Sequence, residues 1–178
     1  MSSLEGKVII ITGASGFLGN KYCDALMDVG ANVIGWDTKN IIPVDVIDPV
    51  SVKEGTERAM KRFGRIDVLI NNAALNPAPN DPAAKAQFSP YESYPLELWK
   101  KEIEVGLTGA MICTQAVAPI MMKQKSGSII NIGSHYGVVA PDNRIYPEGM
   151  FKSIAYATVK GAKLNFTRTW ASYLGPYK

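Results

Sequence analysis

Short runs of apolar residues alternate along the chain with longer stretches in which apolar and polar positions are mixed. The clearest runs are 7–12 (KVIIIT), 32–36 (NVIGW), 66–71 (IDVLIN) and 128–132 (SIINI). A short, almost continuous apolar run is typical of a strand that is buried on both faces. The segment 42–46 (IPVDV) has the same character more weakly, and we expect another strand there.

The mixed stretches have the spacing of helices that bury one face. They cover residues 19–30, 49–63, 96–123 and 153–174. Gly30 is suited to end the first helix, and Pro49 to open the second, where its missing N–H has no cost. Two long connections remain, 76–95 with five prolines and 135–152. Connections of this length within a compact domain are usually functional or mobile.

The order of these elements predicts the fold class. Strands that alternate with helices pair in parallel through right-handed crossovers, which places helices on both faces of one sheet. We therefore expect an α/β protein with a three-layer, doubly wound parallel sheet, the Rossmann fold. The length of 178 residues predicts a single domain over 1–178.

Composition and charge exclude several other classes. Apolar residues make up 47% and charged residues 20%, and the formal net charge is +3 with no dense basic block, which argues against nucleic-acid binding. No stretch approaches the roughly 20 apolar residues of a membrane span, and the N-terminus does not read as a signal peptide. We expect no membrane partner and a cytoplasmic protein. His135 is the sole histidine and no CxxC is present, so we expect no metal site.

A glycine-rich turn links the first strand to the first helix. It reads Thr12-Gly-Ala-Ser-Gly-Phe-Leu-Gly19, with glycines at 13, 16 and 19. In a dinucleotide site the first glycine makes a tight turn, the second lets the backbone approach the pyrophosphate, and the third lets helix and strand pack closely. The phosphates would lie on the free N–H groups at the helix start. The predicted binding residues of this turn are Gly13, Ser15, Gly16, Phe17, Leu18 and Gly19.

Two acidic residues follow the next strands. Asp37 lies 18 residues after Gly19, where an acidic side chain accepts the ribose hydroxyls of NAD. It would repel a 2′-phosphate, which favours NAD over NADP, whereas the nearby Lys39 acts against that preference. Asp45, followed by Val46, could meet the adenine. Each acid could instead be a solvated loop residue.

Together these motifs resemble the short-chain dehydrogenase/reductase family. The resemblance covers nearly all 178 residues and rests on five segments in family order. They are TGASGFLG (12–19), Asp45-Val46, NNAA (71–74), NIGS (131–134) and YATVK (156–160). It implies that Asn72, Ala73 and Ala74 border the cofactor and that Asn71 stabilises the sheet.

The resemblance also implies a catalytic centre at Tyr156, Lys160 and Ser134. Tyr156 and Lys160 are four residues apart on a predicted helix, so they lie on one face, and an ammonium beside a phenol stabilises its phenolate. The family uses this tyrosine to exchange the proton of an alcohol or carbonyl while hydride moves to or from the nicotinamide. Its lysine holds the nicotinamide ribose, and its serine donates a hydrogen bond to the substrate oxygen. The alternative is an exposed pair on a surface helix.

The sequence departs from the family pattern in three places. The spacing TGxxGxxG resembles the sugar-nucleotide epimerase branch more than the usual TGxxxGxG. Gly106 occupies the position of a family asparagine that completes a tetrad and holds a proton-relay water, so we expect impaired catalysis. The chain also lacks the C-terminal strands, the Pro-Gly loop and the helix that the family has, which predicts a truncated chain with an uncovered sheet edge.

The functions that follow are ranked. The first is an NAD(P)-dependent oxidoreductase that interconverts an alcohol and a carbonyl. Residues 137–152 resemble an insertion, and their polar and aromatic side chains suit a sugar-like substrate as well as a solvated loop or a subunit contact. The second is a catalytically impaired dinucleotide-binding or assembly protein, and the third a sugar-nucleotide epimerase or dehydratase. In the family the helices over 96–123 and 153–174 pair between subunits, which implies a homodimer or homotetramer.

Overall fold

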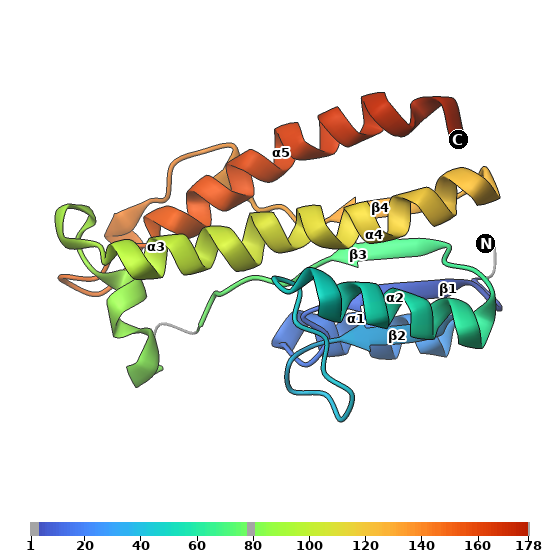
Figure 1. Cartoon of the computed structure of the whole chain (residues 1–178). Helices are drawn as coiled ribbons and strands as arrows, with labels where there is room; N and C mark the ends of the chain where they lie inside the picture. The colour runs from blue at the N-terminus through green and yellow to red at the C-terminus, as the bar shows by residue number, and fades with distance from the viewer. Residues whose placement is uncertain (1–3, 78–80, 178) are drawn as a thin grey trace.

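A parallel sheet of four strands forms the centre of the computed structural model, which describes residues 4–77 and 81–177 (Figure 1). The strands lie in the order β2-β1-β3-β4. They are β1 (Val8–Thr12), β2 (Asn32–Trp36), β3 (Val68–Asn71) and β4 (Ser128–Asn131). This confirms the predicted α/β class.

The strand register brings their carboxyl ends to the same edge of the sheet. Thr12 is paired with Trp36, and Asn71 with Asn131. The residues that follow each strand therefore meet at this edge, although they are far apart in the sequence. In open α/β sheets, ligands bind in the crevice outside this edge.

Five α-helices surround the sheet. They are α1 (Phe17–Asp28), α2 (Pro49–Phe63), α3 (Leu96–Ile103), α4 (Gly109–Gln124) and α5 (Ile154–Leu174). A π-helical turn over Glu104–Thr108 joins α3 to α4, so the predicted helix 96–123 is long but not regular. The two long connections contain short 3₁₀ turns, including Pro82–Phe88 and His135–Gly137, where we expected irregular chain.

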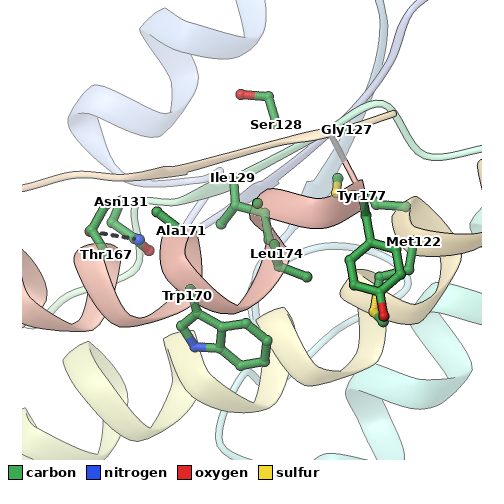
Figure 2. Close-up of a pocket in the computed structure, with 12 residues that line it drawn as sticks. Met122, Gly127, Ser128, Ile129, Asn131, Thr167, Trp170, Ala171, Leu174 and Tyr177 are labelled. Carbon is green, nitrogen blue, oxygen red and sulfur yellow. Dashed lines mark hydrogen bonds between the residues drawn. The ribbon is translucent and has the colours of Figure 1, made fainter. Parts of the chain in front are cut away.

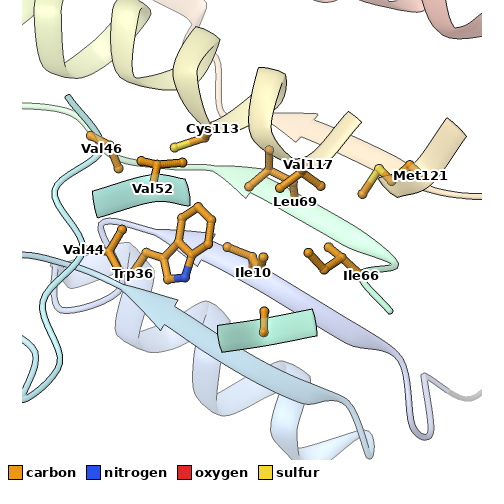
Figure 3. Close-up of a cluster of buried hydrophobic side chains, with 11 residues drawn as sticks. Ile10, Trp36, Val44, Val46, Val52, Ile66, Leu69, Cys113, Val117 and Met121 are labelled. Atoms are coloured by element: carbon orange, nitrogen blue, oxygen red, sulfur yellow. The ribbon is translucent and has the colours of Figure 1, made fainter. Parts of the chain in front are cut away.

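Side chains of β1 alternate between two cores, one on each face of the sheet. Ile9 and Ile11 pack with Leu26 of α1. Ile10 faces the opposite way, into a larger cluster that α2 and α4 complete (Figure 3). That cluster comprises Ile10, Trp36, Val44, Val46, Val52, Ala59, Ile66, Leu69, Cys113, Val117 and Met121. Strict alternation of this kind is what a strand buried on both faces requires.

The predicted strand over 42–46 is wrong. Val44 and Val46 are buried in the larger core, but the segment pairs with no described strand. Pro43 has no N–H to give to a ladder. The N–H of Val44 donates to the carbonyl of Asp37, and the N–H of Asp45 donates to Ser51 Oγ, so the backbone is bonded to a turn and to α2.

The outer edge of β4 is open in the described part of the chain. No described strand pairs with it, and Ile130 is 44% exposed on a strand whose neighbours are buried. Among the described residues a single helical stretch, Leu96–Gln124, is long and apolar enough to cross a membrane. Cys113, Val117 and Met121 from this stretch pack into the larger core, as in a helix that covers a sheet.

Candidate active site

Close packing at the glycine-rich turn holds α1 against the end of β1. Gly13 has φ +66°, a left-handed conformation that favours glycine. A Cβ on Gly19 would lie 2.1 Å from the Gly13 carbonyl oxygen and 2.8 Å from Ala14 Cα. The first turn of α1 is therefore packed directly on the backbone of the turn before it.

The N-terminus of α1 is open at this turn. Its N-cap is Gly16, which supplies no side-chain cap, and the first turn carries no acidic residue within the described chain. Phe17 is 83% exposed, so its side chain does not cover the helix start. The first N–H groups of a helix have no intrahelical partner and attract anions, so this terminus has the chemistry of a phosphate site.

Asp37 directly follows β2 and reaches the glycine-rich turn. Its Oδ2 accepts the N–H of Ser15 at 3.0 Å, and its Oδ1 accepts the N–H of Lys39 at 3.0 Å. Ser15 Oγ donates to Asn40 Oδ1 at 2.8 Å. An ionised carboxylate has about four acceptor positions, so two backbone bonds leave it able to accept ribose hydroxyls.

The segment after β3 is bound to the same turn. Asn72 Nδ2 donates to the carbonyl oxygens of Thr12 (3.0 Å) and Gly13 (3.2 Å). The backbone N–H groups of Asn72 and Ala73 both donate to Thr12 Oγ1. Ala74 is half-buried next in sequence. These bonds explain why an Asn–Asn–Ala–Ala segment follows this strand, since the amide fixes the turn from the side.

Asp45 and Val46 lie apart from these bonds. Asp45 Oδ1 accepts the N–H of Ile47, which closes a turn ahead of α2. Val46 is 7% exposed and packs in the larger core. The structure therefore gives both residues a local structural part, and their predicted contact with adenine stays a prediction.

Tyr156 and Lys160 lie on one face of α5, near its N-terminus. Lys160 Nζ is 5.4 Å from the centre of the Tyr156 ring and donates to the carbonyl oxygen of Ile132 at 2.6 Å. Lys160 is 3% exposed whereas Tyr156 is half-buried. Burial, with a contribution from the charge of Lys152, lowers the pKa of Lys160 to about 8.

Ser134 lies on the short connection that follows β4. It caps the turn His135–Gly137, and its Oγ accepts the N–H of Tyr136 at 3.2 Å. This turn packs against α5. Ser134 is half-buried, and its hydroxyl hydrogen is free to be donated, because the bond to Tyr136 uses it as an acceptor.

A buried polar network that the sequence analysis missed fixes the start of α5. Ser153 Oγ accepts the N–H of Tyr156 at 3.0 Å and donates to Glu102 Oε2 at 2.7 Å. The Tyr94 hydroxyl bonds to the other carboxylate oxygen of Glu102, which is 2% exposed. Burial and the Glu102 carboxylate raise the pKa of Tyr94. The signals in sequence were Ser153 at the N-cap position and an acid on the buried face of a helix.

Lys152 is a second lysine at the catalytic tyrosine. Its Nζ lies 4.1 Å from the centre of the Tyr156 ring, closer than that of Lys160. Its side chain is 7% exposed, and burial lowers its pKa while Glu102 acts in the opposite direction. The sequence analysis placed Lys152 in a polar loop without assigning it to the site.

Gly106 lies in the π-helical turn and faces α5. A Cβ at this position would be 2.7 Å from Val159 Cγ1. The space that a side chain at 106 would occupy is therefore filled by the valine that precedes Lys160. The structure thus gives a packing reason for glycine where the family pattern has asparagine.

A separate cavity of about 290 Å³ lies at the other end of α5, between α4 and β4 (Figure 2). It is lined mostly by apolar side chains, and Asn131 and Thr167 are bonded to each other at its rim, 3.0 Å apart. None of the predicted site residues lines it. Among the described residues no cluster of three or more His, Cys, Asp or Glu could hold a metal ion.

The fold and these side chains define a class of protein with a dinucleotide-type glycine turn and a Tyr–Lys pair at the same sheet edge. The family model for short chain dehydrogenase matches residues 7–178. The chain belongs to this family, and the resemblance drawn from its motifs is confirmed.

Relatives of this family share about a third of their residues with the chain. An oxidoreductase from Staphylococcus saprophyticus is 36% identical over 163 residues, which are 82% of this chain and 62% of the relative. The sorbitol-6-phosphate 2-dehydrogenase of Klebsiella pneumoniae is 30% identical and matches 98% of this chain and 66% of its own. The chain therefore spans about two thirds or less of the length of these relatives.

Solved structures agree with this assignment. The crystal structure of an NAD⁺-bound xylitol dehydrogenase superposes with a TM-score of 0.82 at 27% identity, over 99% of this chain and 68% of that one. The architecture of four parallel strands with flanking helices is thus that of dehydrogenases in this family.

Proposed function

We propose that this chain carries the dinucleotide site and the proton-transfer centre of an NAD-dependent oxidoreductase that interconverts an alcohol and a carbonyl. The observation that carries the proposal is the position of Tyr156 beside Lys160 on α5, with Lys160 Nζ 5.4 Å from the phenol ring. Lys160 is bonded to the carbonyl of Ile132, which follows β4, and the glycine turn follows β1 at the same edge of the sheet.

The residues present fit a nicotinamide dinucleotide. The turn from Gly13 to Gly19 has no room for side chains at its close approach, and the open N-terminus of α1 suits a pyrophosphate. Asp37 would accept ribose hydroxyls and oppose a 2′-phosphate, which favours NAD over NADP. Lys160 would hold the nicotinamide ribose. When bound, NAD supplies the hydride acceptor.

The side chains of this chain handle the proton. In the oxidative direction the Tyr156 oxygen takes the hydroxyl proton of the substrate while its C–H hydrogen leaves as hydride. The Lys160 ammonium stabilises the phenolate, and Ser134 Oγ donates a hydrogen bond to the substrate oxygen. Reduction reverses each transfer, so that Tyr156 returns the proton.

Turnover of polyols with NAD tests this assignment in a Tyr156→Phe variant. We expect the rate to fall about 100- to 10,000-fold, because the ring remains but the proton carrier is lost. Tyr173→Phe is the matched control, because Tyr173 is 62% exposed near the end of α5. Equal activity in the parent and Tyr156→Phe would refute the assignment, and titration with NADH against NADPH measures the cofactor preference.

The substrate class is also part of the proposal. Polar and aromatic residues of the 135–152 connection lie beside the catalytic tyrosine, since burial and nearby tyrosines, Tyr136 and Tyr156 among them, raise the pKa of Tyr146 to about 12. A hydroxylated, sugar-like substrate suits such a surface. Support comes from relatives and neighbours that are named as acting on sorbitol 6-phosphate and xylitol. Stabilisation by hydrophobic ketones alone in a thermal-shift screen would contradict this class.

A second candidate is a dinucleotide-binding protein with impaired catalysis. The contact between Val159 and the space at Gly106 favours it, since no side chain at 106 can hold a relay water. NADH binding without turnover of any alcohol or carbonyl in the panel would select this candidate.

Assembly and location complete the proposal. We propose that the protein acts in the cytoplasm as a homodimer or homotetramer whose subunits pair through the helices α4 and α5. Light scattering at micromolar concentration tests this, and a monomeric mass would contradict it.

A further inference from the structure

The side chain of Lys152 stands at the catalytic tyrosine but does not belong to the Tyr–Lys pair. It directly precedes α5, whose N-cap is Ser153, and it is 7% exposed. Its Nζ lies 4.1 Å from the centre of the Tyr156 ring and 5.8 Å from that of Phe88. The ammonium is thus held against the face of the phenol that transfers the proton.

The charge of Lys152 has no carboxylate partner within 4 Å among the described residues. Its one described hydrogen bond goes to Asn76 Oδ1, which is neutral. An ammonium has three donors, so two remain. Glu102 is the acid whose charge acts on Lys152, and both of its carboxylate oxygens are already bonded, to Tyr94 and Ser153.

Two more buried lysines stand on the same helix. Lys160 donates to the carbonyl of Ile132, and Lys163, 1% exposed, donates to the carbonyl of Asn71 at 3.1 Å. Neither has a carboxylate within 4 Å in the described chain. The charge of Lys152 lowers the pKa of Lys160, and that of Lys160 lowers the pKa of Lys163, so the three cations act on each other.

The other basic side chain of the neighbouring loop is already paired. Arg144 Nε donates to Asp142 Oδ1 at 2.8 Å, and its Nη2 donates to Asp142 Oδ2 at 2.9 Å. The loop holds Lys152 through its backbone instead, because the N–H of Lys152 donates to Asn143 Oδ1. Lys152 is therefore the cation that this loop presents to the site with donors left over.

We propose that Lys152 binds a negatively charged group of the substrate, a carboxylate or a phosphate, and so selects acidic hydroxy or oxo compounds. The inference rests on the proposed function, because it takes Tyr156 as the proton-transfer residue. The anionic group would lie a few bonds from the reacting carbon, since Nζ and the phenol share one site. Desolvated cations bind such groups more strongly than exposed ones.

Calorimetric titration of the NAD-saturated protein at low salt provides the test. The probes are acetate for a carboxylate, inorganic phosphate for a phosphate ester, and acetamide as the neutral match of acetate. We expect at least one anion to bind about tenfold or more tightly than acetamide, because a charge-assisted hydrogen bond contributes that much. The stronger of the two anions identifies the source of the charge. Equal binding of all three probes, or no millimolar binding of either anion, overturns the proposal.

Variants separate Lys152 from the rest of the protein. Lys152→Met should abolish the preference for the anion, and Lys152→Arg should keep most of it. Lys101→Met is the control, because Lys101 is exposed on α3, and it should leave the preference unchanged. An undiminished preference in Lys152→Met overturns the proposal. If that variant does not fold, the comparison of Lys152→Gln with the parent decides instead.

The two proposals can fail separately. A protein that binds no NADH but still binds acetate through Lys152 refutes the proposed cofactor and leaves the anion site in place. A protein that binds NADH and turns over neutral alcohols as well as acidic ones, in the parent and in Lys152→Met alike, refutes the anion site alone.

Discussion

Substitution of Gly19 by alanine tests how closely α1 packs on the glycine-rich turn. The added Cβ would lie 2.1 Å from the Gly13 carbonyl oxygen and 2.8 Å from Ala14 Cα. Ordinary contacts between such atoms are 3.5–4.0 Å. Because both atoms belong to the backbone, no side chain can move aside, and α1 must shift away from β1.

The size of the effect follows from two opposing terms. Overpacking of this kind costs about 1–3 kcal/mol. Alanine in place of glycine within a helix returns up to about 1 kcal/mol. We therefore expect Gly19→Ala to lower the free energy of unfolding by about 1–2 kcal/mol, or the Tm by about 2–4 °C for each kcal/mol. NADH binding should weaken as well, because the displaced turn no longer presents its N–H groups to the pyrophosphate.

Gly161→Ala is the matched control. Gly161 lies inside α5, and its added Cβ would meet its nearest neighbour, the Gly137 carbonyl oxygen, at 3.4 Å. That variant should gain about 0.5–1 kcal/mol through helix propensity. Urea unfolding followed by circular dichroism, with NADH titration of the folded variants, measures both effects. If Gly19→Ala is as stable as Gly161→Ala and binds NADH like the parent, the reasoning is refuted.

Two other perturbations act on α5. Gly106→Asn should cost about 1–3 kcal/mol through its contact with Val159, and Val159→Ala in the same chain should recover part of that loss; additive losses in a double-mutant cycle would contradict the contact. Stability of the parent should rise with pH above about 7, because burial, aided by Lys160, lowers the pKa of Lys163 to about 7 and the unfolded chain then binds more protons. Lys163→Met should reduce this rise in urea titrations between pH 6 and 9, and an unchanged slope would count against it.

Most of the fold was accessible from the sequence, because periodicity and turn residues agree along most of the chain. The helix over 49–63 has the predicted bounds, since Asp48 caps it and Gly64 ends it in the left-handed conformation. The failure at 42–46 has a specific reason. Burial of Val44 and Val46 gives an apolar pattern like that of a strand, while Pro43 and the bond to Ser51 direct the backbone elsewhere.

The candidate site was predicted only where one motif stands next to its strand. Gly13, Asp37 and Ser134 each follow a strand, so parallel pairing alone predicts that they meet. The network of Tyr94 and Glu102 joins segments about fifty or more residues away from Ser153 in sequence. Spacing within one helix cannot reveal such a contact, because it depends on how α3 crosses α5.

The three buried lysines of this region raise a question of stability as well as function. Each ammonium is taken out of water and receives a carbonyl or an amide oxygen in return, and this compensates less than a carboxylate would. Apolar residues at these positions would fill the same space without that cost. Their combined positive potential is, however, what a phenolate at Tyr156 and an anionic substrate both require. Destabilised cations at the start of α5 are therefore best explained by the chemistry proposed for this end of the sheet.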